Sequence, residues 1–121
     1  MVSVIRRKHA ALWHYAVEPE TGHGPGEKTW PLVFSFLRHT FAARVPADAD
    51  PRKGPLKFDA LDFNAGYLGR RWDAEKGGYQ ELPIAASADF DGDKATASRL
   101  VNKGYAADWQ AFQRDGEVNK P

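Results

Sequence analysis

Apolar residues recur every four positions over residues 31–45, the spacing of one helix face. These residues are Val33, Leu37, Phe41 and Val45. Thr29 can cap the start of the helix, and Pro31 falls in its first turn, where a missing N–H does no harm. Pro46 ends the run. The sequence therefore predicts a helix over 31–45. The alternative is a strand whose apolar side is formed by Leu32, Phe34 and Phe36.

A second apolar stripe at helical spacing lies near the C-terminus and predicts a helix over 93–114. Its members are Leu100, Val101, Tyr105, Trp109 and Phe112. Asp91 or Asp93 can cap this helix, because a carboxylate accepts free N–H groups and suits the positive end of the helix dipole. We expect Trp109 to lie in the core and the tail at about 116–121 to fray.

The middle of the chain alternates between apolar and polar residues, which is typical of a strand. The apolar positions are Leu61, Phe63, Ala65 and Tyr67. A helix through the same stretch is possible, but Gly66 and Gly69 would each cost it about 1 kcal/mol relative to Ala. We therefore favour an antiparallel β-meander centred on residues 56–87.

Two six-residue segments, 17–22 and 72–77, share the order hydrophobic, acidic, any, Glu, any, Gly. The acidic side chain can hold a backbone N–H at a turn, and the closing Gly22 or Gly77 can adopt the left-handed conformation. The second segment would join two paired strands, formed by Tyr67–Trp72 and Gly78–Leu82, in a hairpin. The alternative for it is a helix end capped by Gly77. Residues 2–17 fit either a strand or a short helix.

These elements predict one α+β domain over residues 1–121, with the antiparallel meander packed against two helices. The alternative is an all-α bundle in which residues 56–73 are helical.

The net charge of +1 is lower than nucleic-acid-binding proteins usually carry. The chain has no cysteine, which excludes disulfides and thiolate chemistry and favours the cytoplasm. We expect no membrane span, because no apolar run approaches about 18 residues. We reject a signal peptide at the N-terminus and predict no cofactor.

One acidic cluster begins like a calcium loop, with Asp89, Asp91 and Asp93 at its first, third and fifth positions. The sixth position, normally Gly, is Lys94, and the twelfth, normally Glu, is Leu100. The three aspartates are therefore candidate metal ligands in an incomplete motif. We expect an acidic turn there and no metal.

The predicted hairpin combines cationic and aromatic side chains, the types that follow phosphates and stack on bases in single strands. These candidate binding residues are Tyr67, Arg70, Arg71, Trp72, Lys76 and Tyr79. Glu75 and Glu81 dilute the positive charge. Strand alternation also places Arg70 and Arg71 on opposite faces. An ordinary amphipathic hairpin explains the same residues.

No catalytic signature can be completed from the histidines and serines. The histidines are His9, His14, His23 and His39, and their spacing matches no metalloenzyme motif. The leading hypothesis is a non-enzymatic binding protein whose partner is another protein or a second copy, because seven Phe, four Trp and four Tyr exceed what one small core easily buries. The alternatives are nucleic-acid binding through the Arg70–Tyr79 hairpin, and a small enzyme or ligand-binding fold with a pocket that no linear motif reveals.

Overall fold

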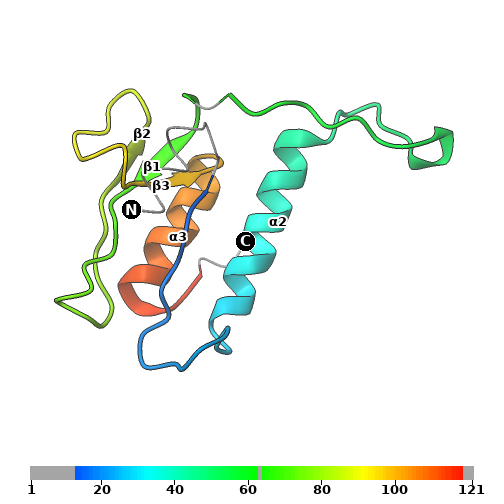
Figure 1. Cartoon of the computed structure of the whole chain (residues 1–121). Coiled ribbons are helices and arrows are strands. Elements are labelled where there is room, and N and C mark those ends of the chain that lie inside the picture. The colour runs from blue at the N-terminus through cyan, green and yellow to red at the C-terminus, as the bar shows by residue number, and fades with distance from the viewer. Residues whose placement is uncertain (1–12, 63, 119–121) are drawn as a thin grey trace.

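Over residues 13–62 and 64–118 the protein is an α+β structure with two helices and one small antiparallel sheet, as predicted, so the all-α alternative is wrong (Figure 1). The computed structural model describes residues 13–62 and 64–118. The elements are helix α2 (Thr29–Arg44), the 3₁₀ turn η1 (Pro51–Lys53), strands β1 (Tyr67–Gly69), β2 (Ile84–Ala86) and β3 (Ser98–Leu100), and helix α3 (Lys103–Asp115).

The sheet has the strand order β2-β1-β3, with antiparallel pairing throughout. Tyr67 on β1 pairs with Ala86 on one side and with Leu100 on the other. Strand β1 is therefore central, whereas a simple meander would place the strands in sequential order. Helix α3 packs against all three strands and also against α2, which places it in the middle of the fold (Figure 1).

Helix α3 begins later than predicted, because Ser98–Leu100 pairs with β1 as a strand instead of forming the first turns of a helix. The cap is Asn102, whose Oδ1 accepts the Tyr105 N–H at 2.9 Å. The prediction that Asp91 or Asp93 caps the helix is wrong. Asp93 Oδ1 instead accepts the Ala95 N–H at 2.9 Å in the turn that precedes β3.

The predicted C-terminal apolar stripe does form the core. Tyr105, Trp109 and Phe112 on α3 are each no more than 1 % exposed. Leu100 on β3 and Leu32 on α2 complete this main cluster from neighbouring elements, and Leu82 joins it. Beyond the helix, Gly116 accommodates the left-handed C-cap conformation, and Val118 packs against the main core.

Residues 13–17 run as an irregular extended segment beside α3, so within this part of residues 2–17 neither the predicted strand nor the predicted helix forms. Trp109 Nε1 donates to the Tyr15 carbonyl at 3.0 Å. The Gln113 side chain accepts the Val17 N–H and donates to the Val17 carbonyl, both at 2.9 Å. Side chains of α3 therefore satisfy backbone groups that a strand would otherwise pair. Residues 2–12 lie outside the described residues.

The two turn motifs behave differently. In the first, Glu20 rather than Gly22 adopts the left-handed conformation (φ 66°), so that prediction is wrong. In the second, Asp73 Oδ1 accepts the Glu75 N–H at 3.0 Å and Gly77 is left-handed (φ 62°), as predicted.

The hairpin predicted around the second turn is wrong in its pairing. Strand β1 covers only the first half of Tyr67–Trp72, Gly78–Leu82 forms no strand, and β1 pairs instead with Ile84–Ala86, so residues 70–83 form a long loop between β1 and β2. In this loop the Gln80 side chain accepts the Asp73 N–H at 2.9 Å and donates to the Asp73 carbonyl at 2.8 Å, so side-chain bonds replace a ladder. The strand predicted from Leu61 onward begins only at Tyr67, because a turn joins Asp62 to Ala65. Phe63 lies outside the described residues.

Candidate functional site

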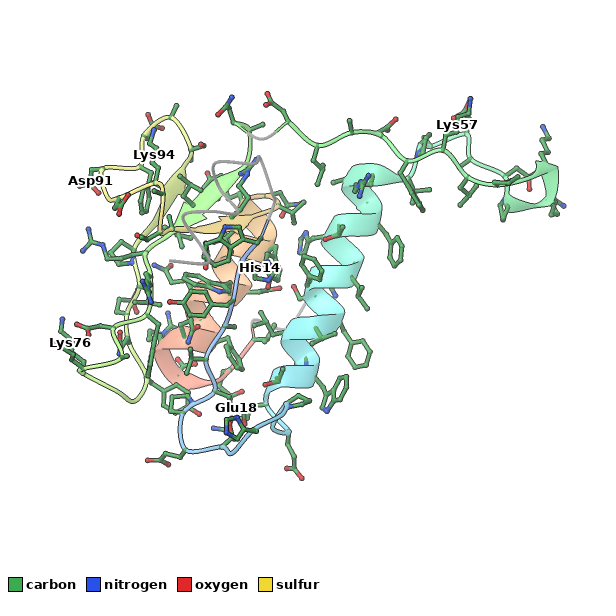
Figure 2. All side chains as sticks on the ribbon, in the orientation of Figure 1. His14, Glu18, Lys57, Lys76, Asp91 and Lys94 are labelled. Atoms are coloured by element: carbon green, nitrogen blue, oxygen red, sulfur yellow. The ribbon has the colours of Figure 1, made fainter. Side chains whose placement is uncertain are left out.

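Helix α2 presents four large apolar side chains to solvent on the side turned away from α3. Trp30 is 50 % exposed, Phe34 63 %, Leu37 40 % and Phe41 56 %. These four residues are called the outward α2 face below. Figure 2 shows side chains projecting from this side of the helix with no other element over them. Contiguous apolar surface of this kind marks an interaction site more often than an isolated exposed residue does.

The helix has apolar residues on both sides, and the opposite side is the one that is buried. Leu32 and Ser35 are 4 % and 2 % exposed, and Phe36 packs against the main core. Ser35 Oγ donates a hydrogen bond to the buried carboxylate of Asp108 on α3, and Arg38 Nη2 lies 3.9 Å from the same carboxylate. These contacts fix the rotation of α2 about its axis.

The apolar stripe predicted for α2 is therefore not the side of the helix that packs in the core. Of its four members, Leu37 and Phe41 are exposed, and Val33 and Val45 are only partly buried. The bounds of the predicted helix are nearly right, but Thr29 is not its cap. Thr29 Oγ1 instead donates to Glu18 Oε2 at 2.6 Å, which ties the first turn of α2 to the preceding segment.

The outward α2 face has a regular spacing of four, three and four residues. This alternation places all four side chains in one narrow stripe, as at the a and d positions of a coiled coil. The stripe predicted from the sequence contains Leu37 and Phe41 but not Trp30 or Phe34. The spacing was visible in the sequence, but a helix that is apolar on two sides does not reveal which side is buried.

The loop that follows α2 leaves the body of the protein and returns to the helix end (Figure 1). At its base the Asp59 N–H donates to the Arg44 carbonyl at 2.7 Å, and Arg44 Nε donates to the Asp59 carbonyl at 3.1 Å. Phe58 is 51 % exposed, with the Arg44 guanidinium 5.6 Å from its ring centre. A further exposed aromatic ring therefore lies near the C-terminal end of α2.

The six predicted hairpin residues do not share one surface. Tyr67 lies on β1 and packs against the main core, and so does half-buried Trp72, whose Nε1 donates to the Gly78 carbonyl at 3.0 Å. Tyr79 is 39 % exposed, and Lys28 Nζ lies 5.4 Å from its ring centre. The Tyr67 and Trp72 rings therefore serve mainly in packing, whereas the Tyr79 ring is partly open to solvent.

Four of the six, Arg70, Arg71, Trp72 and Lys76, do line a common open hollow in the loop between β1 and β2. Acidic residues line the same hollow, and Lys76 Nζ lies 3.9 Å from Asp73 Oδ2. Arg70 Nη2 also lies 4.0 Å from Asp91 Oδ1 on a neighbouring loop. Figure 2 shows Lys76 at the far end of its loop. The hollow thus combines both signs of charge.

The acidic cluster is open to solvent. Asp89, Asp91 and Asp93 are all exposed, and two of them are engaged as described, Asp91 with Arg70 and Asp93 with the turn before β3. Within residues 13–62 and 64–118, no three His, Asp or Glu side chains come close enough together to hold a metal ion. Of the helices that the structure describes, none is long and apolar enough to cross a membrane.

The described histidines occupy separate positions. His14 is largely buried, and its Nε2 lies 2.7 Å from the Tyr105 hydroxyl. Burial lowers the pKa of His14 to about 4 and raises that of Tyr105, so both groups are neutral at pH 7. His39 is partly buried beside α3, His23 lies in an exposed loop, and His9 is outside the described residues.

Comparisons of this chain with protein-family models, curated proteins and solved structures find no match.

Proposed function

We propose that this protein acts through protein–protein contacts, and that the outward α2 face binds a second copy of the chain. The observation that carries the proposal is the exposure of Trp30, Phe34, Leu37 and Phe41, each by 40 % or more, in one continuous stripe. Aromatic side chains in such a position supply most of the binding energy in many interfaces.

A second copy suits the outward α2 face because the 4-3-4 spacing of its four side chains is symmetric about the middle of the stripe. When two copies of α2 pack antiparallel about a two-fold axis, Trp30 lies opposite the second copy's Phe41, and Phe34 lies opposite the second copy's Leu37. A two-fold interface requires this kind of self-complementarity. The 4-3-4 spacing also suits side chains that interlock between two helices.

The size of the face is sufficient for the centre of an interface. Large aromatic side chains bury about 150–250 Å² each, so half-exposed residues give this face on the order of 400 Å² of apolar surface. A stable interface uses about 800 Å² from each partner, with a polar rim around an apolar centre. The loop after α2, with exposed Phe58, stands near the helix end and offers further surface.

The mass of the pure protein in solution tests the proposal. Sedimentation equilibrium of the wild type at micromolar concentration should give twice the chain mass, and Phe34→Glu should give the chain mass. Tyr79→Glu, a matched change on an exposed aromatic residue of the hairpin loop, should leave the dimer intact. Far-ultraviolet circular dichroism verifies that both variants are folded. A wild type that stays monomeric, or a Phe34→Glu variant that stays dimeric, contradicts the proposal.

Cross-linking tests the antiparallel geometry separately, because the chain contains no cysteine. A mixture of Trp30→Cys and Phe41→Cys proteins should form disulfide-linked pairs that contain one chain of each kind. Each variant alone should cross-link far less. Preferential pairing of Trp30→Cys with itself would indicate parallel helices and contradict the antiparallel arrangement.

Nucleic-acid binding by the hairpin is the second candidate, and it is supported by the shared hollow of Arg70, Arg71, Trp72 and Lys76. The acidic residues in that hollow weaken it. If it binds single strands, affinity should fall steeply with salt, and replacing Arg70 and Arg71 by Ala should flatten this dependence by up to about two phosphate equivalents. The absence of cysteine favours action in the cytoplasm for either candidate.

A further inference from the structure

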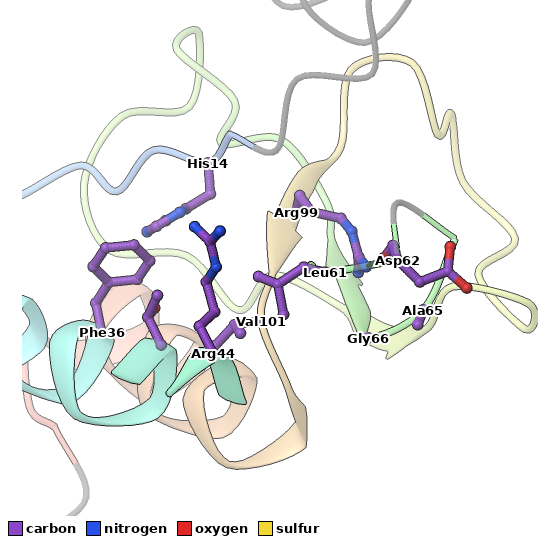
Figure 3. A pocket seen from close by; sticks show the side chains of 10 residues that line it. His14, Phe36, Arg44, Leu61, Asp62, Ala65, Gly66, Arg99 and Val101 are labelled. Atoms are coloured by element: carbon purple, nitrogen blue, oxygen red, sulfur yellow. Dashed lines mark hydrogen bonds between the residues drawn. The ribbon is translucent and has the colours of Figure 1, made fainter. Parts of the chain in front are cut away.

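A pocket of about 210 Å³ lies between the C-terminal half of α2, the segment that contains His14, and the residues that flank β1 and β3 (Figure 3). Much of its wall is apolar. Phe36 forms one side, and Leu61 and Val101 form another. Because a water molecule occupies about 30 Å³ in the liquid, this volume suits a molecule of roughly seven to ten non-hydrogen atoms.

Two polar groups of α2 reach this pocket from positions one turn apart. The Arg44 guanidinium extends upward beside His14 in Figure 3. Its Nε donates to the Asp59 carbonyl and its plane lies near the Phe58 ring, which leaves the terminal nitrogens as further donors. Thr40 Oγ1 is buried and has no hydrogen-bond partner among the described residues. A buried hydroxyl without a partner costs free energy, because it has lost its hydrogen bonds to water. A ligand atom that bonds to the Thr40 hydroxyl would replace one of those bonds.

Two arginines, Arg44 and Arg99, and one aspartate, Asp62, line the pocket. Arg99 lies in its wall and donates to the Asp62 carbonyl at 2.7 Å and to the Tyr67 carbonyl at 3.4 Å. The Asp62 carboxylate accepts the Asn64 N–H at 2.9 Å and points away from Arg44 in Figure 3. Among the described residues, Arg44 has no carboxylate within ion-pair distance. His14 is neutral through its burial.

We infer that this pocket binds a small carboxylate with an apolar body. The carboxylate would accept hydrogen bonds from the terminal nitrogens of Arg44 and from Thr40, since a guanidinium matches the geometry of a carboxylate. The apolar body would pack against Phe36, Leu61 and Val101. None of the pocket residues belongs to the outward α2 face, and the proposal does not depend on self-association.

Three probes separate the parts of this proposal. Hexanoate carries both the charge and the apolar chain, 1-hexanol carries the chain without the charge, and acetate carries the charge without the chain. In calorimetric titrations of the full chain at pH 7, hexanoate should bind saturably, and each of the other two should bind at least tenfold more weakly. Equal binding of hexanol and hexanoate would overturn the role of Arg44, and no saturable binding of hexanoate would overturn the site.

Two variants and a control assign the contacts. Arg44→Gln should weaken hexanoate binding at least tenfold, and Thr40→Val, which keeps the side-chain shape, should weaken it several-fold. Arg52→Gln, a change of the same kind at an 89 % exposed arginine, should leave the affinity unchanged. Unchanged affinity in a folded Arg44→Gln protein would refute the assignment. If that variant does not fold, the comparison of the three probes on the wild type decides.

Discussion

The Tyr105 hydroxyl lies 2.7 Å from Nε2 of His14 and joins the first turn of α3 to the segment that precedes α2. The two residues are 91 positions apart in the chain. The rings of Phe36 and Tyr105 pack around His14, with centres 4.9 Å and 5.2 Å from its own. An imidazole enclosed in this way resists protonation, so the stability of the folded state should depend on pH.

Stability should fall as the pH is lowered from 6.5 to 4. The pKa of His14 is about 4 in the folded protein against 6.5 in the unfolded chain, so the unfolded chain takes up the proton first. The free energy of unfolding is therefore highest above pH 6.5, where His14 is neutral in both states. It decreases toward pH 4, by up to about 3 kcal/mol in total. Urea unfolding at pH 7 and pH 5 measures the loss. His14→Gln should flatten this part of the profile, and His23→Gln, at an exposed position, should not.

Trp109→Ala should cost about 3–5 kcal/mol of unfolding free energy, because it removes a fully buried aromatic residue from the core. Trp30→Ala is the matched control. Trp30 is 50 % exposed, so its loss should cost less than about 1 kcal/mol in the monomer. Urea titration below the concentration at which the protein associates measures both values. Similar costs for the two tryptophans would mean that their burial is wrongly assigned.

The two helices show what periodicity can and cannot predict. The spacing of Tyr105, Trp109 and Phe112 marks a buried stripe because only one side of α3 is strongly apolar. Leu100 fits the same stripe but lies on a strand, since its pairing with Tyr67 is a contact that helical spacing does not contain. In α2 both sides are apolar, and the Ser35–Asp108 contact, across 73 positions, decides which is buried.

The pocket was beyond sequence reasoning for the same reason. His14, Arg44 and Arg99 come from three distant segments, and no linear motif joins them. The six hairpin residues, by contrast, lie within 13 positions of one another, so the sequence alone predicts that they are neighbours. The Tyr67 and Trp72 rings nevertheless pack against the main core, and the backbone N–H of Trp72 donates to the Tyr15 hydroxyl at 3.1 Å, a contact with a distant segment.

Asn102→Ala should destabilise the protein by about 1 kcal/mol, because it removes the side-chain acceptor at the start of α3. Asn102→Asp keeps an acceptor and should retain most of the stability. Thermal unfolding followed by circular dichroism compares the two variants. An alanine variant as stable as the wild type would show that the Asn102 bond to the Tyr105 N–H contributes nothing.

Gly77→Ala should destabilise the protein by roughly 1 kcal/mol or more, because Gly77 has a φ of 62°, where a side chain is strained. No atom lies within 4 Å of an added Cβ at this position, so the cost would come from the backbone and not from a clash. Gly22→Ala is the matched control, since that position is equally open and its φ lies outside the left-handed region. It should be neutral or slightly stabilising. Urea titration of the two variants under the same conditions measures the difference. Equal stabilities would show that the turn at residues 72–77 tolerates a side chain, and the glycine in the repeated motif would then have no conformational role at either position.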